Sequence, residues 1–347
     1  MSKEPESLTE SLILVCNPRA GGRWRQLAGI LDSAEAQHVR RIVTDSIDDI
    51  GPALANLGRR TKLVIIYGGD GTIQQILTDV YRTVGHDDHT APPIALVGGG
   101  TMNLTARWCG WKESPEENFR TIAHDVRTDK LATREVPLLR IQQGDRVEYG
   151  FLFAVGSPIR ILNEYEHGKK GKLAAVQFFA RAIATVWSKQ PLIESNMEPM
   201  AAQIIVDGEP LPYTNWVMAA VAITGSLQIG MHPFVGERVS ETFYMLSYAV
   251  DPREVAVLLP FLARGMLPID PKSLLQPVSS VTHIGLSYFG KGSLPLPLDP
   301  RYINHPARTF EIRCQEKVFT IDGEIFESTG EPIKITVGPT LRLAIKA

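Results

Sequence analysis

Short apolar runs that end in glycine-rich turns are the feature that most constrains the fold of this chain. Three such runs lie in its first third: Ser11–Cys16 before Asn17-Pro18-Arg19-Ala20-Gly21-Gly22, Lys62–Tyr67 before Gly68-Gly69-Asp70-Gly71-Thr72, and Pro93–Val97 before Gly98-Gly99-Gly100-Thr101. Such short apolar runs are typical of strands buried on both faces of a parallel sheet. Ligands of open parallel sheets bind beyond the carboxyl ends of the strands, where glycines let backbone N–H groups approach a phosphate. The pattern predicts an α/β domain with a nucleotide or phosphate site.

Two further signals support this α/β interpretation. Val39–Thr44 is another candidate strand. After the turn that ends at Thr72, apolar residues recur with the spacing of a helix, namely Ile73, Ile76, Leu77 and Val80. Strands that alternate with helices favour a parallel sheet, so we expect this domain to span residues 1–134.

The sequence changes character from about Glu135 onward. Pro- and Gly-punctuated runs there read as strands. Two of them lie within 136–156 and are joined by a turn at Gly144-Asp145. The others are Ala202–Val206, Trp216–Ile223, Thr242–Val250, Thr309–Cys314, Val318–Ile321 and Ile333–Val337. One helical segment, roughly Leu173–Ser188, interrupts them. We therefore expect residues 135–347 to form a mostly antiparallel β-sandwich.

Composition excludes several classes of function. The 347 residues carry a formal net charge of −2, so the chain has no global basic excess and nucleic acid is not an expected partner. Cys16, Cys109 and Cys314 are widely separated and form neither a disulfide framework nor a zinc motif. The polar start lacks a signal-peptide pattern, and no apolar run has the length of a membrane span, so we expect a cytoplasmic protein.

Asp70 lies between glycines in the tight turn that ends at Thr72. An aspartate in such a turn often only hydrogen-bonds to its own backbone. At the mouth of a phosphate site, the same carboxylate can orient Mg²⁺ or accept a proton from an attacking hydroxyl. We favour the second interpretation.

The ordered motifs resemble those of the diacylglycerol kinase catalytic-domain superfamily, which includes bacterial soluble lipid kinases, sphingosine kinases and ceramide kinases. They are Asn17-Pro18-x-x-Gly21-Gly22, Gly68–Thr72, Gly100-Thr101-x-Asn103 and Ile321-Asp322-Gly323-Glu324. The resemblance implies an N-terminal α/β nucleotide domain similar to those of NAD kinases and phosphofructokinases. It also implies a C-terminal β-sandwich and an active site in the cleft between the two.

The resemblance also implies roles for individual residues. ATP would be bound by Asn17, Thr44, Gly68, Gly69, Asp70, Gly71, Thr72, Gly100 and Thr101, with Asn103 supporting the site. Glu324 would accept the proton of the lipid hydroxyl, and Asp70 would be a second catalytic group and a ligand of Mg²⁺. A second Asp-Gly-Glu tripeptide, residues 207–209, is interpreted as an ordinary turn.

Three departures from the family pattern bear on the metal. Gln74-Gln75 stands where the family usually has Asn-Glu, and Leu104 follows Asn103 where the family has Asp. The segment 232–242 lacks the Asp-Asp-Gly that the family associates with a structural Mg²⁺. The detailed ligands of Mg²⁺ are therefore left open.

The sequence predicts an ATP-dependent kinase that phosphorylates a membrane lipid such as diacylglycerol, ceramide or a sphingoid base. We expect peripheral contact with the membrane through Lys169, Lys170 and Lys172, which precede an apolar helix; a helix that is simply part of the core is an equal alternative. An NAD kinase and an inactive nucleotide-binding regulatory protein are the other functions considered. A homodimer is compatible with the sequence.

Overall fold

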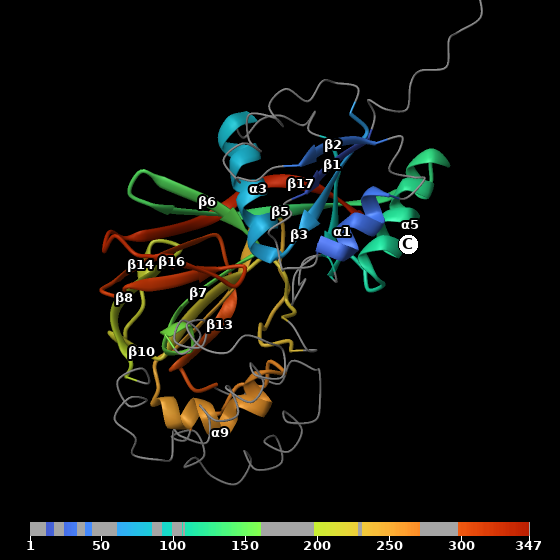
Figure 1. Ribbon diagram of the computed structural model, residues 1–347. Coiled ribbons are helices and arrows are strands. Elements are labelled where there is room, and N and C mark those ends of the chain that lie inside the picture. The colour runs from blue at the N-terminus through green and yellow to red at the C-terminus, as the bar shows by residue number, and fades with distance from the viewer. Residues whose placement is uncertain are drawn as a thin grey trace, which may run out of the picture. The chain divides into compact units, whose positions relative to one another are not determined.

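The computed structural model describes residues 12–16, 24–32, 39–43, 61–84, 92–98, 106, 108–160, 198–227, 231–270 and 298–346 (Figure 1). The chain divides into two compact units. Unit 1 consists of Met1–Phe151, Ile321–Glu324 and Val337–Ala347. Unit 2 consists of Leu152–Thr320 and Ile325–Thr336.

A parallel sheet forms the centre of unit 1. Its strands β1 (Leu12–Cys16), β2 (Arg40–Val43), β3 (Leu63–Gly68) and β4 (Ile94–Gly98) are arranged in the order β2-β1-β3-β4. Every residue of β1, β3 and β4 is buried, as their apolar sequences predicted. The register pairs Gly68 of β3 with Gly98 of β4, so both strands end at the same edge of the sheet.

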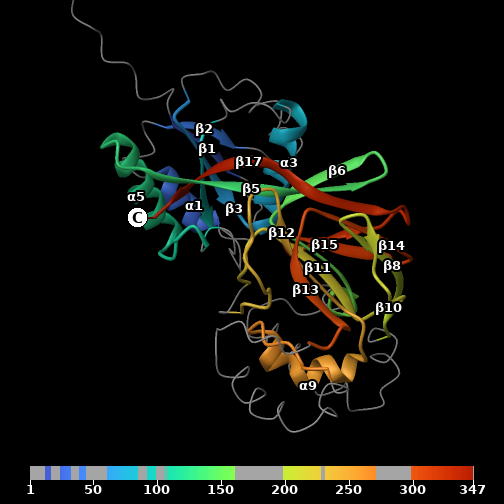
Figure 2. The same ribbon diagram turned by 180° about the vertical axis from the view of Figure 1, so that it is seen from behind.

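Strands from later in the chain extend this sheet. The long strand β17 (Ile333–Ile345) pairs in parallel with β4 through Leu343 and Ile94. The strand β5 (Ala132–Gln143) pairs with β17 and forms an antiparallel hairpin with β6 (Arg146–Gly150). Figure 2 shows β17 and β5 running alongside each other. The hairpin confirms the turn expected at Gly144-Asp145. The parallel sheet also gains β17, whose first residues the sequence analysis had assigned only to the sandwich.

The described residues of unit 1 include three helices beside the sheet: α1 (Trp24–Leu31), α3 (Asp70–Val84) and α5 (Pro115–Arg127). Helix α3 confirms the predicted helix after the glycine turn, and its residues Ile73, Ile76 and Leu77 are buried. Helix α5 begins with a capping box in which Ser114 and Glu117 satisfy each other's backbone N–H groups. Its buried residues include Phe119 and Ile122.

Unit 2 consists of antiparallel strands. One sheet contains β13 (Tyr302–Ala307), β12 (Phe243–Tyr248), β11 (Met218–Ala222), β7 (Leu152–Gly156), β15 (Val318–Ile321) and β16 (Glu324–Glu327), in that order. The other strands are β8 (Met200–Val206), β9 (Glu209–Pro210), β10 (Asn215–Trp216) and β14 (Thr309–Cys314), which pairs with the start of β17. An α/β unit and an antiparallel β unit confirm the predicted two-domain fold class.

One described helix of unit 2 has no counterpart in the sequence predictions. Helix α9 (Pro252–Leu262) begins at Asp251, whose side chain accepts a hydrogen bond from the Arg253 N–H. Its residue Leu262 belongs to a core cluster that includes Tyr248 and Tyr302, and Val255 and Leu258 pack against that cluster. The helix expected at Leu173–Ser188 lies outside the described residues. None of the helices in the described part of the chain is both long and apolar enough to cross a bilayer.

Candidate nucleotide and catalytic site

The glycine turn after β3 is the first part of the site. Helix α3 starts directly from this turn, and the Ile73 N–H donates to the Gly69 carbonyl oxygen at 3.0 Å. A Cβ built on Gly68 would lie 2.7 Å from the Cβ of Thr72, so only glycine allows so tight a turn here. The first N–H groups of a helix have no partner within it, and together they favour a bound anion. The start of α3 is therefore suited to hold a phosphate.

The second part of the site is the hairpin turn between β15 and β16. Asp322 and Gly323 both have positive φ values, 53° and 92°, which is the type I′ geometry that Asp-Gly prefers. The Asp322 carboxylate is buried and accepts hydrogen bonds from the Phe151 N–H at 2.9 and 3.1 Å. A Cβ on Gly150 would lie 2.4 Å from Ile321 and 2.8 Å from Asp322. This close fit to Gly150 and Phe151 fixes the turn within unit 1.

The fixed turn places Glu324 against the start of α3. A Cβ built on Gly71 would lie only 2.2 Å from Glu324 Oε1, so this carboxylate contacts the glycine turn directly. The Glu324 residue is exposed, and it is therefore accessible to a substrate hydroxyl. The predicted proton acceptor and the predicted phosphate turn, which lie more than 250 residues apart in the sequence, are thus brought together.

The other Asp-Gly-Glu tripeptide has the same turn geometry in different surroundings. Asp207 and Gly208 have φ values of 51° and 87°. The Asp207 carboxylate accepts hydrogen bonds from the N–H groups of Arg308 and Thr309, both at 2.8 Å. Glu209 is exposed and pairs with Val206 at an edge of unit 2. The prediction that this tripeptide is an ordinary turn agrees with these contacts.

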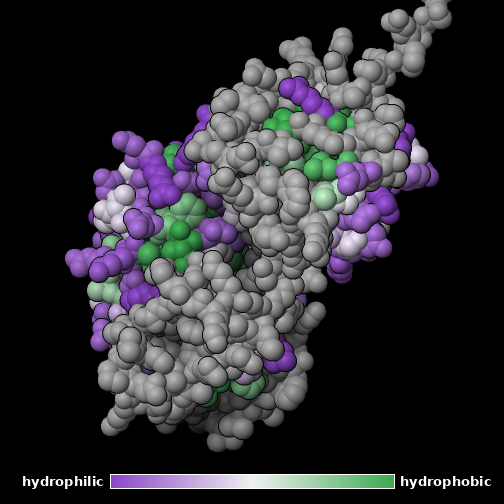
Figure 3. Space-filling view, viewed as in Figure 1, coloured by the Kyte–Doolittle hydropathy of each residue, from purple (hydrophilic) through white to green (hydrophobic). Residues whose placement is uncertain are grey.

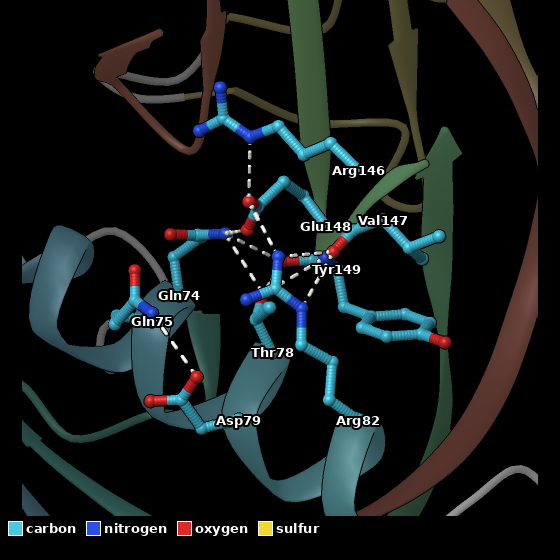
Figure 4. Close-up of polar contacts among 9 residues, drawn as sticks. All are labelled: Gln74, Gln75, Thr78, Asp79, Arg82, Arg146, Val147, Glu148 and Tyr149. Carbon is cyan, nitrogen blue, oxygen red and sulfur yellow. Dashed lines mark hydrogen bonds and ion pairs between the residues drawn. The ribbon is translucent and has the colours of Figure 1, made fainter. Parts of the chain in front are cut away.

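A buried polar cluster anchors α3 to β6 (Figure 4). The Gln74 amide nitrogen donates to Thr78 Oγ1 at 3.0 Å, to Glu148 Oε2 at 3.1 Å and to the Tyr149 carbonyl oxygen at 3.2 Å. The Tyr149 N–H in turn donates to Thr78 Oγ1 at 3.0 Å. Gln74 stands where the family usually has Asn, and its longer side chain reaches across to the hairpin of unit 1.

Two arginines complete this cluster around Glu148. Arg82 and Arg146 each lie 2.9 Å from Glu148 Oε1, and the Glu148 side chain is only 6% exposed. Arg82 also donates to the Val147 carbonyl oxygen at 2.7 Å. Hydrophilic residues gather over this hairpin in the space-filling view (Figure 3). Sequence reasoning missed Glu148, because it lies 74 residues from Gln74 and in no motif.

Several predicted site residues lie outside the described part of the chain: Asn17, Thr44, Gly100, Thr101, Asn103, the side chain of Asp70, and the membrane lysines Lys169, Lys170 and Lys172. Their roles stay predictions. Among the described residues, no group of three or more His, Cys, Asp or Glu side chains could hold a metal ion.

The segment that departs from the family's Asp-Asp-Gly pattern is held by hydrogen bonds to side chains. Asn304 donates to the Pro233 carbonyl oxygen at 2.7 Å and accepts from the Val235 N–H at 2.9 Å. Thr242 Oγ1 accepts from the Val239 N–H at 3.0 Å. The Arg238 guanidinium also donates to the Thr242 carbonyl oxygen at 3.1 Å, so amide, hydroxyl and guanidinium groups together order this loop of unit 2.

Comparison with known proteins supports the resemblance seen in the motifs and the fold. Residues 11–133 match the model of the diacylglycerol kinase catalytic domain. A crystal structure of a candidate diacylglycerol kinase from Bacillus anthracis str. Sterne is similar with a TM-score of 0.63 and 16% identity, covering 97% of both chains. A second structure, of a diacylglycerol kinase from the same organism, has a TM-score of 0.58 and 15% identity, again covering 97% of both chains. Among curated proteins, none matches the chain.

Proposed function

We propose that the protein is a lipid kinase that transfers the terminal phosphoryl group of ATP to a lipid hydroxyl, since residues 11–133 match the model of the diacylglycerol kinase catalytic domain. The observation that carries this proposal is the contact of the Glu324 carboxylate with Gly71 at the start of α3. A helix start that attracts phosphate and an accessible carboxylate beside it are what phosphoryl transfer to an alcohol needs.

Each of these two features has a role in the proposed reaction. An alcohol is a poor nucleophile until its proton is removed, and Glu324 would take that proton as the hydroxyl oxygen attacks the γ-phosphorus and the bond from that phosphorus to the ADP oxygen breaks, releasing ADP. The backbone N–H groups at the start of α3 stabilise the charge on the phosphate oxygens. Mg²⁺, when bound with ATP, would neutralise further phosphate charge, with Asp70 as the residue expected to hold it.

The acceptor is proposed as a class rather than as one lipid. Diacylglycerol, ceramide and sphingoid bases all present a hydroxyl beside long acyl or alkyl chains, and the roles proposed for Glu324 and the start of α3 concern only that hydroxyl and the phosphate. Because such lipids reside in a bilayer, peripheral contact with the membrane is part of the proposal. Lys169, Lys170 and Lys172 are one expected point of that contact.

The first experiment identifies the acceptor and tests Glu324 together. The protein is incubated with labelled ATP, Mg²⁺ and a total lipid extract, and the labelled product is identified by mass. Glu324→Ala is expected to lower turnover about 10²–10⁴-fold, the usual contribution of a general base, with nucleotide affinity retained. Glu209→Ala changes the same residue type in the other Asp-Gly-Glu turn, and it should leave turnover unchanged.

Three results would contradict the proposal. Equal turnover of Glu324→Ala and Glu209→Ala would remove the assigned base. Labelling of NAD⁺ in a parallel reaction, with no labelled lipid, would identify an NAD kinase instead. Retained ATP binding with no transfer to any lipid would identify a regulatory protein.

A further inference from the structure

An arginine and a tryptophan of unit 1 form a cation–π pair. The Cζ atom of Arg134 lies over the Trp108 ring, 4.2 Å from its centroid. Arg134 belongs to β5 and is exposed, whereas Trp108 is partly buried. The attraction between the charge and the ring face leaves the N–H groups of the guanidinium free to bind a second partner. We call these two residues the Arg134–Trp108 pair.

Backbone contacts place Trp108 toward the edge of the parallel sheet where ligands of such sheets bind. Leu343 of β17 pairs with Ile94 at the start of β4, and the two strands run in the same direction. Lys346, three residues further along the chain, donates its backbone N–H to the Cys109 carbonyl oxygen at 2.9 Å. Cys109, and with it the adjacent Trp108, therefore lies toward the carboxyl end of β4.

The same tryptophan is packed beside the turn that carries Glu324. The rings of Trp108 and Phe151 have their centroids 6.2 Å apart. The Phe151 N–H donates to the buried Asp322 carboxylate at 2.9 Å, within the turn that leads to Glu324. All of these residues belong to unit 1. Trp108 thus connects the Arg134 guanidinium both to the end of β4 and to the turn of the proposed base.

The positive charge of Arg134 has no acidic partner within the protein. Arg134 forms no ion pair with any residue that the structure describes. Glu135, the adjacent acidic residue, lies on the opposite face of β5, because successive side chains of a strand alternate. Glu113 is paired with Lys346 at 2.6 Å, so it does not neutralise Arg134 either. The guanidinium is therefore free to bind an anion from solution.

We propose that Arg134 binds a phosphate group at the carboxyl end of β4, with Trp108 as the platform that positions it. A guanidinium matches a phosphate because it can donate two parallel hydrogen bonds to it. The carboxylates of Asp322 and Glu324 repel an incoming triphosphate, and a fixed cation beside them offsets that repulsion. The group is the triphosphate of the nucleotide or the phosphate of the lipid product. The inference rests on the proposed function, because it adds a residue to the same site.

Isothermal titration calorimetry of the full chain tests the proposal without catalysis. The probes are ATP, inorganic tripolyphosphate, adenosine and the short-chain lipid phosphate dihexanoyl phosphatidic acid. Arg134→Gln should weaken binding about 10-fold, the low end for the loss of a hydrogen bond between charged groups. A loss for ATP and tripolyphosphate identifies the nucleotide as the source of the phosphate, and a loss for the lipid phosphate identifies the product. Adenosine, which has no phosphate, should bind both proteins equally.

Three more variants separate the charge, the ring and the position. Arg134→Lys keeps the charge but not the paired donors, so it should recover only part of the affinity. Trp108→Leu removes the ring and should weaken phosphate binding about 3-fold, as expected for an exposed cation–π contact. Arg40→Gln is the matched control, because Arg40 is also exposed in unit 1 but begins β2 at the opposite edge of the sheet. It should leave the binding of every probe unchanged.

Two results would overturn the role of Arg134. One is equal affinity of the wild type and Arg134→Gln for all the phosphate-containing probes. The other is an equal loss in Arg134→Gln and Arg40→Gln. Thermal unfolding midpoints that match the wild type establish that each variant is folded.

Further outcomes separate this inference from the proposed function. Phosphate binding that depends on Arg134, with no turnover of any lipid by the wild type, would contradict only the proposed function. Turnover that depends on Glu324, with phosphate affinity unchanged in Arg134→Gln, would contradict only the role of Arg134. A wild type that binds none of the phosphate-containing probes would contradict both.

Discussion

The two units each contain an ionic cluster around one central side chain, but the sign of the centre is opposite. In unit 1 the centre is the Glu148 carboxylate, which Arg82 and Arg146 bind from two sides. In unit 2 the centre is the Arg301 guanidinium, which binds Asp299 at 2.7 Å and Glu254 at 2.9 Å. Each cluster joins a helix to residues that lie in a strand or directly before it.

The difference lies in which partner is buried. In unit 1 the centre is buried, whereas the side chains of its partners Arg82 and Arg146 are 42% and 37% exposed. In unit 2 the centre is partly exposed, and its partner Asp299 is 4% exposed. Removal of Glu148 leaves charges that water can solvate, but removal of Arg301 leaves a buried charge without its cation. The cost of breaking an ionic cluster is thus set by what remains buried.

The largest effect is expected for Arg301→Leu. This change leaves the Asp299 carboxylate buried without its cation, and it should lower the free energy of unfolding by about 3 kcal/mol, the lower end of the range for a broken buried pair because Arg301 is partly exposed. Urea unfolding at pH 7 measures this loss. A loss below that of Glu148→Ala would reverse the comparison between the two units.

Glu148→Ala should have the next largest effect. The buried Gln74 amide loses one acceptor, so we expect a loss of about 2 kcal/mol in the free energy of unfolding, together with weaker ATP binding because α3 is less firmly held. Glu148→Gln keeps an acceptor oxygen and should lose about 1 kcal/mol.

Arg120→Ala is the matched control for this prediction. It breaks the exposed ion pair with Glu116 on α5, and it should cost less than ~0.5 kcal/mol. Urea unfolding and nucleotide titration measure all three variants, and equal effects of Glu148→Ala and Arg120→Ala would contradict an anchoring role for the cluster.

The smallest effect concerns pH. Burial alone would raise the pKa of Asp299, but the hydrogen bonds and charge of Arg301 outweigh it and hold that pKa below its ordinary value of 3.8. A lowered pKa contributes stability that is present above the ordinary value and is lost as pH falls through the folded value. The wild type should therefore lose this contribution only below about pH 4.

In Arg301→Leu the same carboxyl should titrate at higher pH, since burial then acts without the cation. The difference in unfolding free energy between wild type and Arg301→Leu should therefore shrink as pH falls from 7 to about 4. A difference that is constant over this range would show that the lost contacts, rather than the buried charge, account for the destabilisation.

The strands of the parallel sheet were predictable because strands buried on both faces have continuous apolar sequences. Ser11–Cys16 and Lys62–Tyr67 each match a described strand to within one residue at either end. The Asp-Gly turn before Glu324 was predictable from the preference of these two residues for tight turns. The role of Glu324 as proton acceptor was predicted only from the resemblance to a family. That Glu324 reaches Gly71 depends on the register of distant strands, which spacing along the chain does not reveal.

The helices α5 and α9 were missed for different reasons. Helix α5 has a readable start, since Ser114, Pro115 and Glu117 form a capping signature, and this signal could have found it. Helix α9 contains the apolar run VAVLLPFL with Pro260 inside it, which periodicity cannot distinguish from a strand. The Gln74–Glu148 contact joins residues that belong to different elements, so no local pattern predicts it.

The pairing of β17 with β4 has a consequence for the order in which the protein folds during synthesis. Ala344 accepts a hydrogen bond from the Trp111 indole at 3.1 Å, and the Lys346 N–H donates to the Cys109 carbonyl oxygen at 2.9 Å. Domains generally fold from the N-terminus as the ribosome releases them. Here the parallel sheet is completed by β17, which is translated after the other strands of unit 2. A nascent chain stopped before residue 333 would therefore expose one flank of β4.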